Sequence, residues 1–288
     1  MARALRHRAG HRARARRAER HAPVRAAPGR DRDELRAPRR GVGGRATLGL
    51  GRGSLYSLIG ERHRGSLQGL TEAVHVCRML LEGDDTPWQG EVFALGPGHG
   101  LKFGTRRRVP ISLGVFGPKG CRRAGAIADG VRAAAQWDPA YMSRAREWIA
   151  EGAREAGRDP SAVEVVLENW TCLDADRERA RARAREVLAT FLPELGPLLS
   201  FYEIPDVEVQ AARDATVHGD RDALATISEQ TIDRFMAAGD ADDLRRGLGR
   251  LEAAGFDAVS FSGILGPRPE DALEILGAEI ARRAEATR

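Results

Sequence analysis

Two glycine-rich turns in this sequence have the composition that binds phosphate groups. The first is Gly-Arg-Gly at 51–53, after the apolar run 46–51, and the second is Phe-Gly-Pro-Lys-Gly at 116–120, after the apolar run 111–115. Each run is too short for a helix and is typical of a buried strand in a parallel sheet. Free backbone N–H groups in such a turn bind an anion, helped by the dipole of a following helix. Glycines needed only for the geometry of a tight turn would give the same pattern.

The second turn belongs to a strand–turn–helix–strand unit. Residues 121–128 have helical composition, and Asp129-Gly130-Val131 begins another apolar run. This order defines a βαβ unit, whose strands are parallel. If both glycine turns serve one phosphorylated ligand, they must lie at the same end of the sheet.

The remaining apolar patterns predict further helices and strands. We expect helices at 67–81, 140–156, 178–192, 242–254 and 269–283, strands at 163–173 and 256–261, a short β excursion at 88–95, and several short helices across 191–236. These elements predict an α/β fold.

Several polar and aromatic side chains fall at informative places in these elements. Asp174 is expected to cap the helix that follows it. Glu168 and Asn169 lie near the end of a strand, where a structural hydrogen bond is the main interpretation and contact with a cofactor the alternative. Trp88 and Phe93 are interpreted as packing residues, with stacking on a ligand ring as the alternative.

The composition limits the class of protein. The chain has 288 residues with 42% hydrophobic content, enough for one large domain or two small ones. It has no run of 18 apolar residues, so we expect no membrane span. Cys77, Cys121 and Cys172 show no CxxC spacing, which favours free thiols in a reducing cytoplasm over disulfides or a bound metal.

Residues 1–42 differ from the rest of the chain. Residues 1–40 hold 14 arginines against four acids, so the remainder carries a small negative charge although the total is +5. Three interpretations stay open: a disordered tail, a non-native sequence translated out of frame, and an arm that binds nucleic acid. The arm has no aromatic residue to stack on bases, so we expect no nucleic-acid partner. We divide the chain into this tail and a domain at 43–288.

Four segments, in this order, resemble the bacterial luciferase-like superfamily. They are GGRATLGLGRGS at 43–54, the helix and GEVF segment at 67–93, GVFGPKG with ADGV at 114–131, and AGFDAV with GPRPEDAL at 254–273. Members of this superfamily are TIM-barrel oxidoreductases that use a reduced flavin or the deazaflavin coenzyme F-420 (F420). The branch most resembled is the deazaflavin-dependent one, which includes the methylenetetrahydromethanopterin reductases.

The resemblance implies a TIM (β/α)8-type barrel that is incomplete at its N-terminus. The fourth to eighth strands are recognisable, whereas the first three βα units are missing or scrambled before Thr47. An incomplete barrel has open edges, so either a second chain supplies the strands or this polypeptide does not function alone. The family's acid/base residues and ring clamp lie on strands two and three, so the catalytic residues stay unknown. Arg52 stands where one branch has an acid, and it cannot accept a proton.

The resemblance also implies a cofactor site on the two turns. The ring or ribityl chain would lie at the first turn and the phosphodiester at the second, giving as cofactor-binding residues Gly51, Arg52, Gly53, Gly114, Phe116, Gly117, Pro118 and Lys119. The implied activity is hydride transfer between F420 and an organic small-molecule substrate. FMN is the alternative cofactor, and the alternative functions are an FMN-dependent monooxygenase and an inactive remnant. Residues 191–236 match a variable insertion that is often a lid or an oligomer contact, which leaves a homo-oligomer open.

Overall fold

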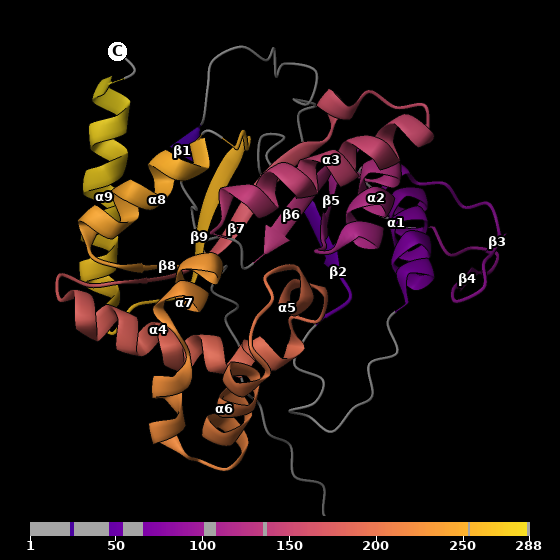
Figure 1. Cartoon of the computed structure of the whole chain (residues 1–288). Helices are drawn as coiled ribbons and strands as arrows, with labels where there is room; N and C mark the ends of the chain where they lie inside the picture. Colours follow the sequence, from indigo (N-terminus) through magenta and orange to yellow (C-terminus); the bar gives the residue numbers. More distant parts are fainter. Residues whose placement is uncertain are drawn as a thin grey trace, which may run out of the picture.

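A mostly parallel sheet lies at the centre of the structure (Figure 1). The computed structural model describes residues 24–25, 46–53, 66–100, 108–134, 137–252 and 254–286. The strand order is β1-β9-β7-β6-β5-β2, with β8 paired to β7, and only β1 is antiparallel to its neighbour. The strands are β1 Val24–Arg25, β2 Leu48–Gly51, β5 Ile111–Gly114, β6 Gly130–Ala134, β7 Glu164–Leu173, β8 Met236–Gly239 and β9 Ala258–Leu265.

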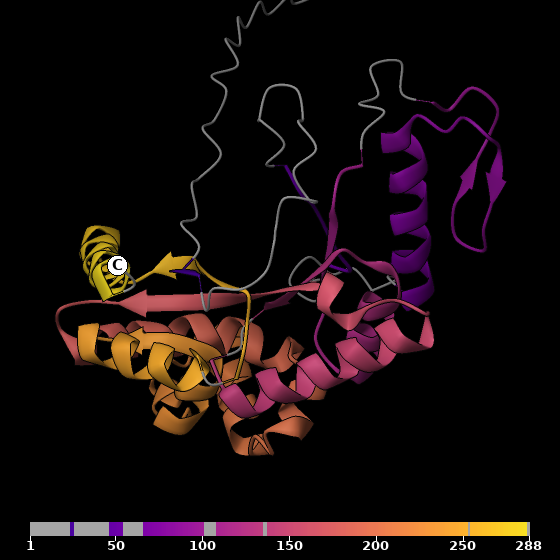
Figure 2. The same ribbon diagram turned by 90° about the horizontal axis from the view of Figure 1, so that it is seen from above.

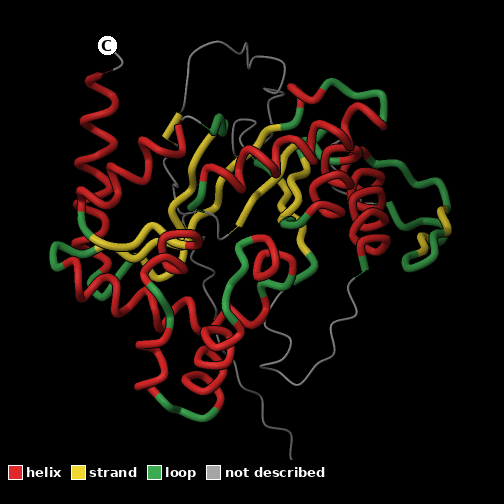
Figure 3. The backbone as a smooth tube through the Cα atoms, in the orientation of Figure 1, coloured by secondary structure: helices red, strands yellow, loops and turns green. Residues whose placement is uncertain are grey.

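Helices follow the parallel strands, and a small hairpin stands apart from the sheet (Figure 3). The helices are α1 Leu67–Glu82, α2 Pro118–Ile127, α3 Pro139–Glu155, α4 Arg177–Phe191, α5 Pro197–Phe201, α6 Asp206–Val217, α7 Glu229–Phe235, α8 Ala241–Glu252 and α9 Pro269–Ala286. Short 3-10 turns occupy Pro160–Ala162, Leu192–Glu194 and Arg221–Thr226, and the hairpin is β3 Trp88–Gln89 with β4 Ala94–Leu95. No described helix is long and apolar enough to cross a membrane.

The two faces of the sheet carry different residues. Parallel in-register pairing puts Ile111, Val131, Val165 and Val259 on one face, and each is at most 2% exposed beneath the helices. Figure 2 shows α3 and α4 on that side of β7. The other face carries glycines, serines and the Arg132–Glu168 pair, with Val166 and Trp170 of β7 as its larger apolar side chains. The helix-covered face therefore forms the hydrophobic core.

The predicted elements are present, with four corrections. The strand at 46–51 was expected to be buried, but β2 is half exposed. Helix α2 begins at Pro118, three residues earlier than predicted. Asp176, not Asp174, caps α4 by accepting the Arg179 N–H, while Asp174 is fully buried and paired with Arg179.

Strand β8 is the fourth correction, because residues 191–236 were interpreted as short helices only. It follows α7 without a turn, and its sequence Met-Ala-Ala-Gly has none of the β-branched or aromatic residues that mark a typical strand. Apart from β1, residues 1–45 lie outside the described part, and the division of the chain at residue 43 stays a prediction.

Helices α2 and α3 cross with their backbones in direct contact. A Cβ at Gly152 would lie 2.6 Å from the Arg122 carbonyl carbon, and a Cβ at Gly125 would lie 2.9 Å from the Ile149 carbonyl carbon. Both distances are shorter than any real packing contact, so only glycine fits at either position. This crossing fixes where the N-terminal end of α2 lies against α3.

The β3–β4 hairpin is attached to α1 through the buried carboxylate of Glu72. Its oxygens accept the backbone N–H groups of Glu91, Val92 and Phe93 at 2.8–2.9 Å, and the Gln68 amide donates a fourth hydrogen bond. Burial by itself would raise the pKa of Glu72, but these hydrogen bonds prevail and lower it to about 2. The hairpin is therefore held by an ionised side chain.

We predict that Gly152→Ala destabilises the fold by at least about 2 kcal/mol, because the new methyl group meets backbone that cannot move aside. Gly249→Ala is the matched control, since Gly249 is exposed on α8 with nothing within 4 Å of its Cβ position. The control should gain up to about 1 kcal/mol from helix propensity. Urea unfolding measures both changes. Equal stability of the two variants would contradict the close crossing.

We predict that the hairpin loses its attachment in acid. The folded pKa of Glu72 lies below the ordinary 4.5, so its contribution is complete above pH 4.5 and is lost as the pH falls toward 2. Hydrogen-exchange protection of the Glu91 and Val92 amides should fall over that range. Glu72→Gln should show low protection at every pH, whereas the exposed control Glu82→Gln should behave as wild type. Unchanged protection in Glu72→Gln would refute this role.

Candidate functional site

Both glycine turns lie at the same end of the sheet. Strands β2 and β5 are parallel and in register, so Gly51 pairs with Gly114 and the two turns begin side by side. A Cβ at Gly51 would lie 3.7 Å from the Gly114 carbonyl oxygen, and both glycines are exposed. A flat or phosphorylated group can therefore approach the backbone here, at the carboxyl ends of the strands. The condition for a shared ligand is met.

The N-terminus of α2 has the properties of an anion-binding turn. Pro118, at the first position, has no N–H to donate, and the Cys121 N–H is taken by the Gly117 carbonyl at 3.0 Å. Within the described residues, no hydrogen bond uses the Lys119 and Gly120 N–H groups. The first turn has no acidic residue, and the Lys119 side chain is exposed. The positive end of the helix thus keeps two donors and a cation for a ligand.

Gly117 serves the same turn in a different way. It is buried, its φ is +83°, and its N–H donates to the Tyr141 hydroxyl at 3.1 Å. A Cβ there would lie 3.2 Å from Pro197 Cβ of α5. The Gly117 N–H is therefore used inside the protein. Phe116 is only partly buried and packs against the hydrophobic core.

The first turn opens onto a small hollow of about 280 Å³. The hollow lies between the end of β2, the start of α1 and the hairpin, and its lining includes Gly51, Arg52, Leu70, Val92 and Phe93. Phe93 is 43% exposed here, so the prediction that it is a packing residue is wrong. Trp88 does pack, on His75, with ring centroids 4.7 Å apart. Gly53 follows Arg52 with a φ of +82° and is not among the residues that line the hollow. An exposed aromatic ring beside a glycine turn can stack on a flat ligand.

Two polar residues of β7 lie on opposite faces of the sheet. Glu168 lies on the open face, where its carboxylate pairs with Arg132 of β6 at 3.5 Å. Asn169 lies on the helix-covered face, fully buried, and neither of its amide atoms has a hydrogen-bond partner among the described residues. The predicted structural hydrogen bond of the Asn169 side chain is therefore wrong, whereas contact of Glu168 or Asn169 with a cofactor stays a prediction.

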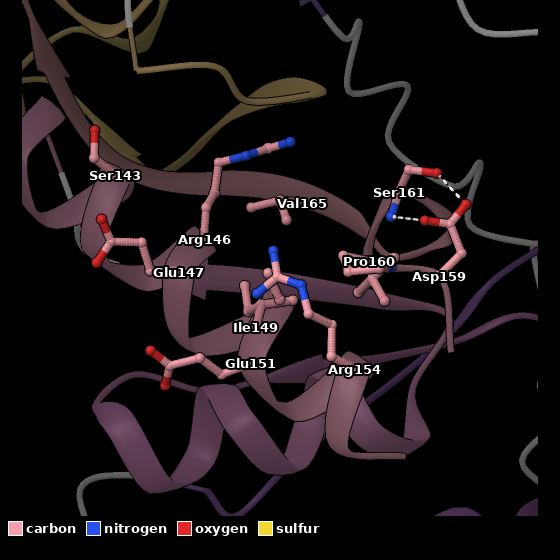
Figure 4. A pocket seen from close by; sticks show the side chains of 12 residues that line it. Ser143, Arg146, Glu147, Ile149, Glu151, Arg154, Asp159, Pro160, Ser161 and Val165 are labelled. Atoms are coloured by element: carbon pink, nitrogen blue, oxygen red, sulfur yellow. Dashed lines mark hydrogen bonds between the residues drawn. The ribbon is translucent and has the colours of Figure 1, made fainter. Parts of the chain in front are cut away.

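A larger pocket than the hollow at the first turn lies away from the glycine turns (Figure 4). It has a volume of about 620 Å³ and is lined by α3, by the 3-10 turn at Pro160–Ala162 and by Val163 and Val165 at the start of β7. Figure 4 shows Arg146 and Arg154 extending into it. Because it lies at the amino ends of the strands, it is not the site that the turns define.

The structure therefore groups the eight predicted cofactor residues at one edge, and two further residues join them. Gly120 supplies a free N–H, and Tyr141 holds Gly117 from 24 residues away. Sequence reasoning placed Tyr141 in a helix but missed its contact, because a link between two elements leaves no periodic signal. Among the described residues, no group of three or more His, Cys, Asp or Glu side chains could hold a metal ion.

The parallel sheet, its helices and the paired turns at the carboxyl ends of β2 and β5 define a protein of the (β/α) barrel type. The luciferase-like monooxygenase family matches residues 41–258, about three quarters of the chain. The chain belongs to this family.

Two curated relatives are 5,10-methylenetetrahydromethanopterin reductases. The protein of Archaeoglobus fulgidus is 32% identical over 247 residues, which cover 83% of this chain and 73% of the relative. The protein of Methanolobus tindarius is 30% identical over 246 residues, covering 83% and 74%. Both are similar in sequence across most of their length.

Solved structures agree with this assignment. The coenzyme F420-dependent tetrahydromethanopterin reductase of Methanopyrus kandleri superposes with a TM-score of 0.72 at 27% identity, covering 84% of this chain and 75% of that one. An F420-dependent secondary alcohol dehydrogenase superposes with a TM-score of 0.62 at 26% identity, covering 82% and 68%. The predicted family and α/β barrel fold are confirmed.

Proposed function

We propose that this protein is an F420-dependent oxidoreductase that transfers a hydride between F420 and an organic substrate. The single observation that carries the proposal is the in-register pairing of Gly51 with Gly114, which puts both turns side by side at one edge of the sheet. Two structural neighbours add support, because the tetrahydromethanopterin reductase of Methanopyrus kandleri and the secondary alcohol dehydrogenase are both F420-dependent.

The residues at this edge fit such a cofactor. The Lys119 and Gly120 N–H groups are free to bind a phosphodiester, and the Lys119 side chain adds a positive charge. At the first turn, Gly51 leaves space where any larger residue would meet the ligand, and Phe93 offers an exposed ring face. The deazaflavin would supply the hydride chemistry. The protein would orient it and keep it in place.

The chain's own contribution is therefore one of binding and orientation. Two anchors, one at each turn, fix both the position and the rotation of a long ligand, whereas a single anchor would leave it free to turn. The aligned sheet edge keeps the distance between these anchors constant. Arg132 and Glu168 lie on the open face of the sheet, so they can contact the ligand or its substrate.

We predict that the purified chain binds F420 and that Lys119→Ala weakens binding by about three- to tenfold, the effect of one point charge at a phosphate. Arg123→Ala is the matched control, because Arg123 is exposed on the same helix, one turn further along. Quenching of the deazaflavin fluorescence gives the dissociation constants. Equal losses of F420 affinity in Lys119→Ala and Arg123→Ala would mean that the effect comes from the overall positive charge and not from a specific contact of Lys119.

The same titration with FMN tests the alternative cofactor. Tighter binding of FMN than of F420 would favour the FMN-dependent monooxygenase. Binding of neither ligand by the folded chain would overturn the proposal and favour the inactive remnant.

A further inference from the structure

Tyr141, a buried residue of α3, contacts the turn at the start of α2. It is 1% exposed, and its hydroxyl accepts the Gly117 N–H at 3.1 Å. A buried hydroxyl costs free energy unless its hydrogen bonds are made, and this one is also hydrogen-bonded with the Cys121 thiol. It thus contacts both ends of the first turn of α2.

The Tyr141 hydroxyl and the Cys121 thiol both stay neutral. Burial raises the pKa of the Cys121 thiol to about 12, and burial together with the neighbouring thiol raises the pKa of Tyr141 as well. The contact is therefore a fixed network of neutral hydrogen bonds at neutral pH. Neither group is suited to act as a base or a nucleophile there, which leaves a role in positioning.

Packing contacts with Phe201 and Trp148 hold the Tyr141 ring in place. It meets Phe201 of α5 edge-on at 5.2 Å and Trp148 of α3 edge-on at 6.2 Å, measured between ring centroids. Pro197 of α5 packs against Gly117 from the outside. The close crossing of α2 and α3 fixes the helix that carries the ring. The hydroxyl has little freedom to leave Gly117.

Gly117 needs such a contact because of its own conformation. With φ +83° and no side chain, it lacks the capping hydrogen bond that a serine or aspartate would make at this position. Its N–H would otherwise be buried without a partner, and its peptide could turn. The Lys119 and Gly120 donors follow directly in the chain, so the orientation of the Gly117 peptide decides where they point.

We infer that Tyr141 is a positioning residue for phosphate binding at this turn: by holding the Gly117 N–H, it keeps the Lys119 and Gly120 N–H groups directed at the ligand. The inference rests on the proposed function for the identity of the ligand. In this arrangement the phosphate binds to the N–H groups of Lys119 and Gly120 and to the Lys119 side chain, while the Gly117 N–H donates to Tyr141 and not to the phosphate.

Tyr141→Phe tests the inference, with Tyr202→Phe as the matched control. Tyr202 is also buried, at 5% exposure, and lies in the same aromatic cluster with its ring centroid 6.1 Å from that of Tyr141. Its Phe variant removes one buried hydroxyl, as Tyr141→Phe does. Two ligands are titrated by fluorescence: F420, and the deazariboflavin that lacks the phosphodiester. Tyr141→Phe should weaken F420 binding about five- to tenfold and leave the phosphate-free ligand within about twofold. Tyr202→Phe should change neither.

A merely structural role would give a different result, because loss of folding or of the pocket would weaken both ligands alike. Equal weakening of both ligands, or no change in either, would overturn the inference while leaving the proposed function intact. Failure of the wild-type chain to bind either ligand would instead count against the proposed function.

Inorganic phosphate gives a second test that needs no cofactor. Added to the wild-type chain, it should shift the Lys119 and Gly120 amide resonances and leave Gly117 unshifted, because that N–H is already bonded to Tyr141. The Lys119 and Gly120 shifts should need about five- to tenfold more phosphate in Tyr141→Phe. A Gly117 amide that shifts as strongly as its neighbours, or no shift in any of the three, would refute the assignment even if the variant did not fold.

Discussion

The parallel, in-register pairing of β2 with β5 is the constraint on which the site depends. Parallel strands carry their carboxyl ends at the same edge, so the turn after each strand must lie beside the other. With glycines at 51 and 114, this pairing leaves the edge open to a ligand. A slip of β2 by one residue against β5 would turn Gly51 to the covered face and put Leu50 in its place.

The crossing of α2 and α3 gives this edge its second fixed point. Gly125 and Gly152 let the helix backbones touch, and Tyr141 extends the same contact from α3 to the first turn of α2. Backbone packing against α3 therefore supports α2, and the hydrogen bond to Tyr141 supports Gly117 at the start of α2. A phosphate site built from backbone N–H groups needs such support, because it has no side-chain geometry of its own to orient it.

The insertion between β7 and β8 is attached to the same framework. Arg181 of α4 is 1% exposed and bonds Asp233 at 2.8 Å and the Ala238 carbonyl at 3.3 Å, which ties α7 and β8 to α4. A buried guanidinium requires such partners, and losing one of them would leave a charge in the core. Through Pro197 and Phe201, this insertion also packs against Gly117 and Tyr141. This insertion thus contacts the second glycine turn directly.

The sequence by itself determined the strands, the main helices, both glycine turns and the family, because these depend on local composition and on periods of two or 3.6 residues. The eight residues predicted to bind the cofactor follow from the same two turns and stay a prediction. Only the tertiary structure decided that the Gly117 N–H donates to Tyr141, while no hydrogen bond among the described residues uses the Gly120 N–H. It also decided that Asn169 is buried without a partner among the described residues and that β8 is a strand. These features depend on contacts between residues far apart in the chain, and such contacts leave no local pattern.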